Sequence, residues 1–542
     1  MEKRRFLALF RSSAVTVLTA LLLPAFNLAS CDGSKEQAQP TWFQGGVIYE
    51  ASPLIMSESG KLAEVANRLP EIKELGVKTL YVLPIFEHEP LLVYRVYDFY
   101  KIAPEVGTAD DLKTLVRRAH ELGIRVLLDL VISHSPAGRE LVKWPDSLTQ
   151  PLLKSRGPLK KMFLETERVN KQRLDELKRT NSAAYEKAIQ ENALPSRSPL
   201  YNRHPDWFLH GADGNPVLTY PNPGWGYAID YSNPDVHQYF ADIAAYYVRE
   251  FNIDGWRIDA PQNNFDPKLF PNAVNSLELL RRVRRAVKSV KPDAMLFAEN
   301  VAADTRFRNE GEPVFDEVCD VSYQQQLYWE MAVRHEEGFR NFTTADLAKL
   351  IADSAPRYGR ARANFIENHD VNRVRAGFPN IWRALAAVQY TLPGVPMIYC
   401  GQEIGETDKF YVDWEHGDQD ARAFYVKLGA LLPRESLRNG TFVPVTVEDN
   451  SLCAFARSSP DELALVAANF RKDSVQASLH PPLNAISLRP AERYLVLDGL
   501  DGSCNYVTRA ELSSVQVEVA AGTVRILFVT PEVDRATTSG GQ

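Results

Sequence analysis

The sequence predicts an α/β protein: a (β/α)8 barrel with a subdomain inserted after its third strand and a C-terminal antiparallel β-sandwich. Three observations lead to this prediction. Apolar strand-like runs alternate with amphipathic helical stretches from about residue 42 to residue 432, in about eight units. A segment at 135–231 interrupts the alternation. From residue 433 the pattern changes to short strands of alternating polarity.

The barrel strands are predicted from continuous apolar runs, because helices bury both faces of a parallel sheet. The helices between them are amphipathic, and the stretch at 61–76 repeats its apolar residues at helical spacing. Eight such units favour a closed barrel over an open sheet. The predicted strands are VIYEA (47–51), TLYVLPI (79–85), RVLLDLVIS (125–133), GWRIDA (255–260), MLFAEN (295–300), a weak one near 318–323, ANFIENHD (363–370) and PMIYCGQ (396–402).

Domain boundaries follow from these changes of pattern. A segment as long as the interruption is expected to have structure or function of its own. Its charges alternate in sign between about residues 154 and 192, which favours a solvated helical surface over the alternative that this segment caps a cleft or lies against it. The predicted parts are a barrel formed by 42–134 and 232–432, an inserted subdomain at 135–231, a β-sandwich at 433–531 and a disordered tail at 532–542.

The N-terminus has the charge-then-apolar layout of an export signal. A basic start precedes AVTVLTALLLPAFNLA (14–29), which is short for a membrane-spanning helix. The run leads into LASC (28–31), which resembles a bacterial lipobox and implies a diacylglyceryl anchor on Cys31. We therefore predict a lipoprotein-type signal at 1–31, a polar tether at 32–41, and an exported, membrane-anchored protein in the periplasm or at the cell surface.

Composition excludes some functions. The formal net charge of -7 gives no basic surface for nucleic acid or for anionic lipid headgroups. Membrane contact is therefore expected only through the lipid on Cys31. No close pair among the 5 cysteines suggests a metal knuckle, so no metal site is predicted from them.

Three acidic residues stand at the ends of predicted barrel strands: Asp259 after GWRI, Glu299 after MLFA and Asp370 at the end of ANFIENHD. In a parallel barrel those ends share one face, where active sites form. Mutual repulsion among three acids in one pocket raises the pKa of at least one, as a general acid requires at neutral pH. Arg257 lies two positions before Asp259, faces the same side of the sheet and can orient that carboxylate.

These residues belong to a set of segments that make the chain resemble the α-amylase family, glycoside hydrolase family 13, over about residues 42–531. Each segment alone is moderately specific, but all of them in order at plausible spacing are very specific. The resemblance implies the barrel, the inserted subdomain and the C-terminal β-domain. The matching segments are VYDFYKIAPEVGT (96–108), DLVISH (129–134), GWRIDAPQN (255–263), FAEN (297–300), FIENHD (365–370) and PGVPMIYCGQEIG (393–405).

The resemblance also implies a role for each matching residue. Asp259 is implied to be the nucleophile that forms a β-glycosyl-enzyme intermediate, Glu299 the general acid and base, and Asp370 the stabiliser of the transition state. The implied substrate is an α-linked glucan or maltooligosaccharide, cleaved with retention and without a cofactor. The residues implied to bind the sugar are Tyr94, His134, Arg257, Asn263 and His369.

Three positions depart from the family pattern. Ser133 stands where an Asn often ligates a structural calcium, and because a hydroxyl is a poorer ligand for this cation, the substitution argues against calcium. Asn263 stands where His is frequent, which leaves acceptor preference open. Arg95 replaces an Asp that binds the non-reducing chain end in several exo-acting members, so an endo mode is mildly favoured.

Other functions fit the same residues. A transglycosylase or an exo-acting α-glucosidase would use the same scaffold and the same acids. A non-catalytic glucan-binding surface lipoprotein is disfavoured, because such relatives usually lose catalytic acids and all three are present here. The choice between α-1,4 and α-1,6 linkages stays open.

Overall fold

The computed structural model describes residues 40–220, 222–261, 274, 276–299, 308–309, 312–324, 327–328, 330, 343–356 and 359–532. Three predictions therefore lie outside the described residues: the N-terminal signal with its anchor Cys31, the sugar-binding role of Asn263, and the disordered tail from residue 533 onward. Within the described ranges, none of the helices combines the length and the apolar character needed to cross a membrane.

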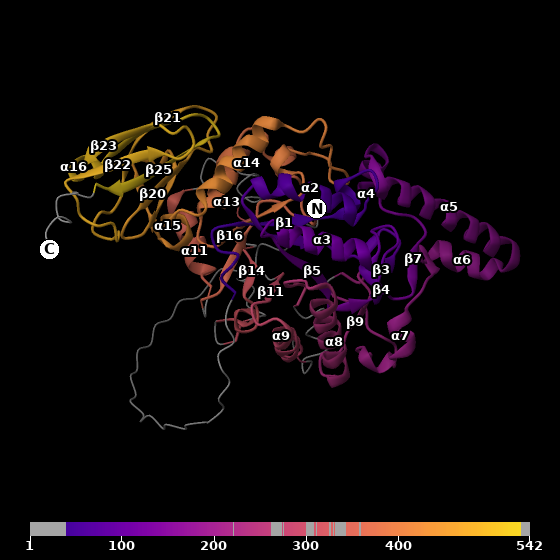
Figure 1. The fold of residues 1–542 in the computed structure, drawn as a ribbon. Coiled ribbons are helices and arrows are strands. Elements are labelled where there is room, and N and C mark those ends of the chain that lie inside the picture. The colour runs from indigo at the N-terminus through magenta and orange to yellow at the C-terminus, as the bar shows by residue number, and fades with distance from the viewer. Residues whose placement is uncertain are drawn as a thin grey trace, which may run out of the picture. The chain divides into compact units, whose positions relative to one another are not determined.

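Eight parallel strands close into the barrel, in the spatial order β1-β16-β15-β14-β11-β10-β5-β2 (Figure 1). This confirms the predicted TIM barrel, including the weak sixth strand, which is β14. The barrel strands are β1 (Val47–Ala51), β2 (Val77–Val82), β5 (Arg125–Val131), β10 (Gly255–Asp259), β11 (Met295–Ala298), β14 (Val321–Tyr323), β15 (Ala361–Asn364) and β16 (Val395–Tyr399).

Helices cover the outside of the barrel, as Figure 1 shows for α2, α3, α8 and α9. In α2 the apolar residues Leu62, Val65, Leu69 and Ile72 are buried against the strands, as their helical spacing predicts. The helices that follow barrel strands are α2 (Leu62–Glu74), α3 (Ala109–Glu121), α8 (Pro234–Phe251), α9 (Leu277–Val290), α11 (Thr344–Asp353), α13 (Trp382–Thr391) and α14 (Gln419–Leu431).

Close packing between β10 and β11 depends on a glycine. Gly255 has a φ of +144°, and a Cβ at this position would lie 2.0 Å from the carbonyl oxygen of Met295. Only glycine can occupy this site without separating the two strands. The strands that carry Asp259 and Glu299 are therefore held in direct register, with Arg257 paired to Phe297.

The C-terminal region forms two antiparallel sheets with a shared core. The larger sheet has the order β17-β19-β20-β25-β22-β23 and the smaller one β18-β21-β24. Alternation along β19 sends Ala454 and Ala456 into this core and Phe455 into the barrel core, so the larger sheet is buried on both faces at β19 and β20. The strands are β17 (Thr441–Pro444), β18 (Thr446–Val447), β19 (Cys453–Ser458), β20 (Leu463–Ala468), β21 (Val475–His480), β22 (Arg493–Asp498), β23 (Cys504–Thr508), β24 (Val515–Val519) and β25 (Val524–Pro531).

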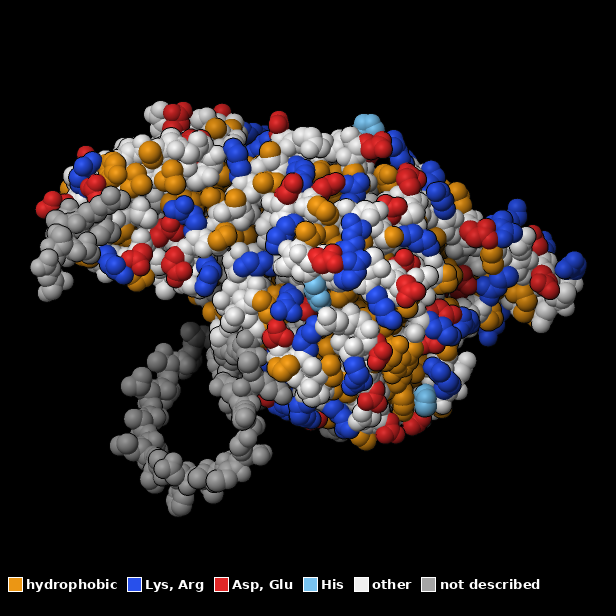
Figure 2. Space-filling view, viewed as in Figure 1, with side chains coloured by type: hydrophobic (Ala, Val, Ile, Leu, Met, Phe, Trp, Pro, Cys, Tyr) orange, Lys and Arg blue, Asp and Glu red, His pale blue; other side chains and the backbone are white. Residues whose placement is uncertain are grey.

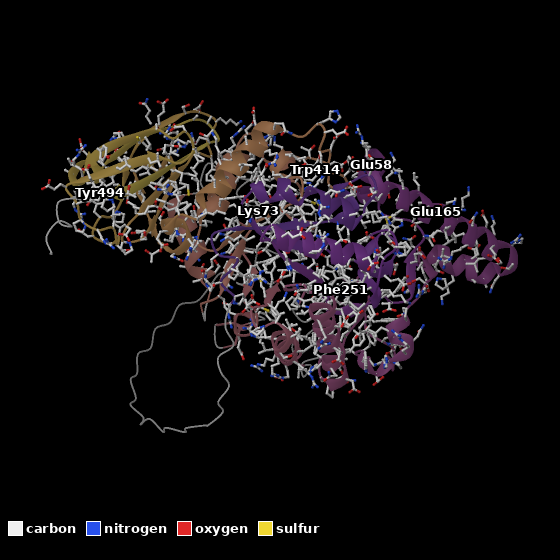
Figure 3. The ribbon with its side chains drawn as sticks, in the orientation of Figure 1. Glu58, Lys73, Glu165, Phe251, Trp414 and Tyr494 are labelled. Atoms are coloured by element: carbon white, nitrogen blue, oxygen red, sulfur yellow. The ribbon has the colours of Figure 1, made fainter. Side chains whose placement is uncertain are left out.

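The segment between β5 and β10 contains small strand pairs and a group of helices. Its strands pair as β6 with β9 and β7 with β8. Helix α5 is the longest element, and Figure 3 shows Glu165 on it, which forms an ion pair with Arg168. Its elements are β6 (His134–Ser135), β7 (Arg139–Leu141), α4 (Asp146–Lys154), α5 (Gly157–Thr180), α6 (Ser182–Gln190), β8 (Ala193–Pro195), α7 (Pro199–Arg203) and β9 (Tyr227–Ala228).

The prediction that the charged insert is a solvated helical surface is correct for only part of α5. On the face seen in Figure 2, acidic and basic side chains are mixed where α5 and α6 lie. Phe163, Thr166 and Asn170 of α5 are nevertheless buried. Helix α5 packs against α1 (Pro53–Met56), which follows the first barrel strand, so one side of it contacts the barrel loops.

Candidate active site

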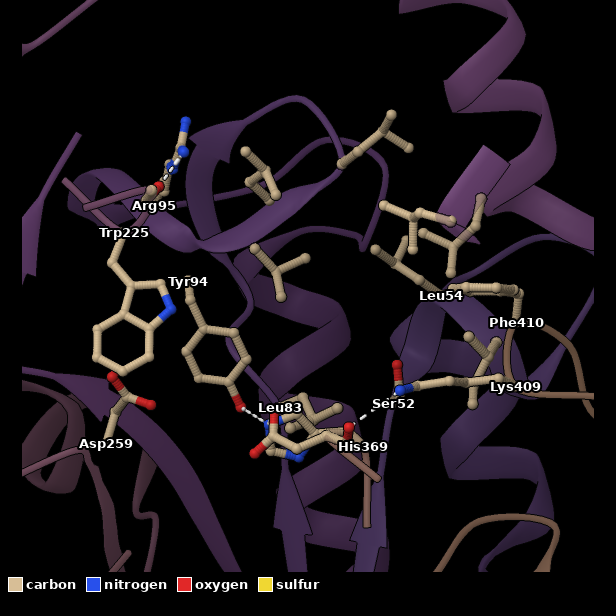
Figure 4. A pocket seen from close by; sticks show the side chains of 18 of the residues that line it. Ser52, Leu54, Leu83, Tyr94, Arg95, Trp225, Asp259, His369, Lys409 and Phe410 are labelled. Carbon is tan, nitrogen blue, oxygen red and sulfur yellow. Dashed lines mark hydrogen bonds and ion pairs between the residues drawn. The ribbon is translucent and has the colours of Figure 1, made fainter. Parts of the chain in front are cut away.

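A cavity of about 540 Å³ opens where the barrel strands end, and it contains most of the predicted site (Figure 4). The strands place these residues together because each carries its site residue at its carboxyl end or in the loop that follows. The predicted residues that line the cavity are Tyr94, His134, Asp259, Glu299, His369 and Asp370.

Arg257 is fully buried and connects three carboxylates. Its Nη1 donates to both oxygens of Asp129 at 2.9 Å and to Oδ1 of Asp259 at 3.0 Å. Its Nη2 lies 2.7 Å from Oε2 of Glu299, which also accepts from the backbone N–H of Ala260 at 3.0 Å. One guanidinium therefore contacts both carboxylates, Asp259 through a hydrogen bond from Nη1 and Glu299 through an ion pair with Nη2.

Burial raises the pKa of the carboxyl groups of both Asp259 and Glu299, while the Arg257 cation lowers them. Repulsion adds to the effect of burial, because Glu299 raises the pKa of Asp259 and Asp370 raises that of Glu299. Two carboxyls on one guanidinium titrate as a pair. A state with one proton on the pair allows one group to donate a proton while the other is an anion.

Tyr94 and His369 form a second connected unit. The Tyr94 hydroxyl donates to Oδ2 of Asp129 at 2.8 Å and lies 2.8 Å from Nε2 of His369. The other ring nitrogen of His369, Nδ1, contacts Glu50. Burial lowers the pKa of His369, but the carboxylates of Asp370 and Glu50 outweigh it and raise the pKa to about 9. A cationic His369 then donates from both nitrogens, to Tyr94 and to Glu50.

Asp370 lies farther from its strand than predicted. Strand β15 ends at Asn364, so Asp370 belongs to the following loop and does not end the strand. The side chain of Asn368 accepts from the backbone N–H groups of Asp370 and Val371, at 3.0 and 3.2 Å, and this turn ends the extended run early. The Asp370 side chain is 56% exposed and is available to a ligand in the cavity.

His134 is buried beside Trp225, with ring centroids 6.1 Å apart. Its Nδ1 lies 2.9 Å from the hydroxyl oxygen of Ser133. Burial and the nearby Arg95 cation lower the pKa of His134 to about 4, although a backbone hydrogen bond opposes them. His134 is therefore neutral at neutral pH and can both donate and accept hydrogen bonds.

The low pKa of His134 predicts a loss of stability in acid. Its pKa falls from 6.5 to about 4 on folding, so the unfolded chain takes up the proton first as the pH drops. The stabilising contribution is complete above pH ~6.5 and is lost as the pH falls toward ~4. At pH ~4.5 we expect a loss of about 2 to 3 kcal/mol in the free energy of unfolding.

Urea unfolding of the wild type and of His134→Gln, each at neutral pH and at pH ~4.5, isolates the contribution of His134 to the free energy of unfolding. The carboxyl titrations are common to both proteins and cancel in the comparison. The wild type should lose about 2 to 3 kcal/mol more than the variant between neutral pH and pH ~4.5. Equal losses in the two proteins would contradict the assigned pKa.

The residues around Ser133 do not fit a structural calcium site. The Ser133 hydroxyl is buried and contacts His134, and no group of three or more Asp, Glu, His or Cys side chains within the described ranges could hold a metal ion. The expectation from the sequence, that a structural calcium is possible but doubtful, stays a prediction. Arg95 donates to Oε1 of Glu89 at 2.8 Å, so it is held at the edge of the cavity by an ion pair.

Sequence reasoning missed Asp129, Glu50 and Trp225. Asp129 begins the DLVISH segment on the strand before β10, and the strand register, which the sequence pattern does not fix, pairs it directly with Arg257. Glu50 belongs to β1 and is fully buried, and its position in the VIYEA run gave a signal: an acid inside an apolar strand needs a partner. Trp225 lies in the Gly- and Pro-rich part of the insert and carried no specific signal.

Together, the fold and the pocket define a class of protein: a (β/α)8-barrel enzyme with clustered carboxyl groups for acid–base and covalent chemistry. The family model of the alpha-amylase catalytic domain matches residues 31–479 of the chain. The chain therefore belongs to the alpha-amylase family of glycoside hydrolases.

Individual relatives are distant. The chain is similar to cyclomaltodextrinases from Bacillus sp. and Geobacillus thermopakistaniensis, both at 27% identity. The aligned parts cover 76% of this chain and 65% of the first relative, and 80% of this chain and 67% of the second. Among solved structures, an alpha-amylase from Geobacillus thermoleovorans in complex with acarbose matches with a TM-score of 0.66 at 20% identity, over 91% of this chain and 99% of that one. This last likeness shows the fold alone.

Proposed function

We propose that the protein is a retaining glycoside hydrolase that cleaves α-linked glucans or maltooligosaccharides through a covalent glycosyl-enzyme intermediate. One observation carries the proposal: Asp259 and Glu299 are bound to opposite ends of the same buried guanidinium in a cavity. Retention needs two carboxyl groups about 5 Å apart, one on each side of the scissile bond. The names of sequence relatives, cyclomaltodextrinase and alpha-amylase, support the substrate class.

In the proposed mechanism Asp259 attacks the anomeric carbon while Glu299 protonates the departing oxygen. Burial raises the pKa of both carboxyl groups and the Arg257 cation lowers both, so the pair can share one proton, which the proposed mechanism assigns to Glu299. Glu299, now an anion, then deprotonates a water molecule that attacks the intermediate and releases the sugar with its α configuration retained.

The remaining residues position the sugar ring. The exposed carboxylate of Asp370 stabilises the positive charge of the oxocarbenium-like transition state. Tyr94 offers a ring face, and its hydroxyl is fixed by Asp129 and His369, so that the face cannot rotate away from the ligand. Neutral His134 supplies hydrogen bonds to sugar hydroxyls, whereas cationic His369, held by Tyr94 and Glu50, contributes positive charge beside the sugar.

Product analysis tests the proposed function. Incubation of the chain from about residue 37 with maltoheptaose and with starch should give short maltooligosaccharides that initially have the α configuration, as observed by NMR. Longer products would indicate transglycosylation, and glucose alone would indicate exo cleavage. A folded protein that leaves every α-glucan unchanged, or products of β configuration, would contradict the proposal.

Glu299→Gln tests the acid–base role. We expect kcat on maltoheptaose to fall about 10³-fold, within the range for general acid catalysis. The loss in the first step should be much smaller with α-glucosyl fluoride, because fluoride departs without a proton. A uniform loss for both substrates would assign Glu299 a structural role instead.

A further inference from the structure

The cavity continues beyond the proposed catalytic residues into a second region, here called the apolar chamber. Figure 4 shows Tyr94 between Asp259 and Trp225 on one side and Leu54 and Phe410 on the other. The residues that define the apolar chamber are Leu54, Leu92, Trp144, Leu152, Phe163 and Phe410.

Helices α4 and α5 form one wall of the apolar chamber. Trp144, Leu152 and Phe163 make a separate apolar cluster, against which Leu92 and Phe410 pack. The cluster thus joins the insert to the loops that follow the second and eighth barrel strands, and Leu54 adds the loop after the first. The insert is part of the binding pocket, in contrast to the solvated surface that its charges predict.

Several contacts hold this wall in place. Arg156 pairs with Asp413 at 3.4 Å, and Arg173 pairs with Glu140 at 2.7 Å. Gly157 lies under the ring of Tyr411, so that an added Cβ would meet the ring at 2.7 Å. The chamber is therefore formed before a ligand binds, and binding does not have to order it.

The order of the barrel strands indicates which part of the substrate, the leaving group or the retained glucosyl unit, lies next to the apolar chamber. In the closed barrel β1 lies four positions from β11, directly across from the strand that precedes Glu299. A general acid must contact the leaving group, so the leaving group extends toward the β11 side. The chamber, at the loops after β16, β1, β2 and β5, faces the glucosyl unit that is retained on the enzyme.

The walls of the apolar chamber do not suit another sugar ring. A ring there would bury hydroxyl groups against Leu, Phe and Trp side chains, while the polar side chains of Ser52 and Lys409 lie at the border with Leu54 and Phe410 (Figure 4). One polar atom in the wall still needs a partner: Nε1 of Trp144, which is 6% exposed and has no acceptor among the described residues. The lining thus fits an apolar group that carries one acceptor oxygen.

We propose that the apolar chamber binds an acyl group esterified to the retained glucosyl unit, so that the preferred substrates are acylated α-glucosides. The hydrocarbon chain packs on Leu152 and Phe163, and the ester oxygen accepts from Trp144 Nε1. This inference rests on the proposed function, since the acyl group is recognised only on a sugar seated at the catalytic residues.

The test uses release of 4-nitrophenol from matched substrates: 4-nitrophenyl α-glucoside, its 4-O- and 6-O-octanoyl esters, and 4-nitrophenyl α-maltoside. We expect at least one ester to exceed the unmodified glucoside in kcat/KM about tenfold or more, because several methylene groups become buried. If neither ester exceeds the unmodified glucoside, or if the maltoside exceeds both esters, the inference is overturned.

Two neighbouring residues on α5 provide a matched pair of variants. Phe163 is 4% exposed and faces the chamber, whereas Leu164 is 49% exposed. Phe163→Ser should lower the ester-to-glucoside ratio of kcat/KM about tenfold, and Leu164→Ser should leave that ratio unchanged. Trp144→Phe keeps a ring of similar shape, removes the N–H and should lower the ratio about threefold even if Phe163→Ser fails to fold.

A binding measurement separates failure of this inference from failure of the proposed hydrolase function. If no glucoside releases 4-nitrophenol, calorimetric titration of the folded protein with 6-O-octanoyl glucose and with glucose decides the inference separately. Tighter binding of the ester, weakened by Trp144→Phe, would support the chamber without the reaction. Equal affinities for the two ligands would overturn it.

Discussion

Asp259→Asn is expected to lower kcat on maltooligosaccharides by at least about 10⁴-fold, because no carboxylate remains to form the glycosyl-enzyme intermediate. Folding should be retained, since the amide has the shape of the carboxyl and Arg257 keeps its contacts with Asp129 and Glu299. Initial rates on maltoheptaose, together with a thermal melt, measure both quantities.

A matched control is Asp235→Asn, which makes the same chemical change at an exposed position in the first turn of α8. It should leave kcat within about twofold of the wild type, as expected for a surface change away from the cavity. Wild-type turnover by Asp259→Asn would contradict the assignment of the nucleophile and with it the covalent mechanism.

Arg257→Met should cost about 3 to 5 kcal/mol of unfolding free energy, the largest stability effect that the site predicts. The substitution leaves Asp129 fully buried with no cation, although the hydroxyls of Tyr81 and Tyr94 still donate to it at 2.5 and 2.8 Å. An uncompensated buried charge is much more costly than the loss of the pair as a whole. Urea unfolding at neutral pH measures the change.

The double variant Arg257→Met/Asp129→Asn tests the cause of this loss. Removal of the unpaired charge should recover about 1 to 3 kcal/mol relative to Arg257→Met alone, a coupling expected for residues in one network. A double variant that is less stable than Arg257→Met would show that packing against the rings of Tyr81, Tyr94 and Tyr323, and not charge, makes Arg257 necessary.

The barrel could be predicted because its strands have to be apolar along their whole length. Runs such as VIYEA and GWRID are buried at every position, which identifies parallel strands between two layers. Convergence of Asp259 and Glu299 followed from the same geometry, because parallel strands bring their carboxyl ends to one face. The position of Asp370 was less accurate, since a side-chain turn at Asn368 ended the strand early.

The sequence by itself thus determined the element pattern and which strand ends would meet. Only the tertiary structure decided which side chains contact one another in the site and which residues line the cavity. β5 and β10 are consecutive barrel strands and therefore neighbours, but Asp129 meets Arg257 only because the register between the two strands pairs these residues. Phe163 lines the cavity because α5 folds back over the loops of other strands, which turns one side of a charged helix inward. Both depend on contacts between residues far apart in the chain, and local patterns carry no record of these contacts.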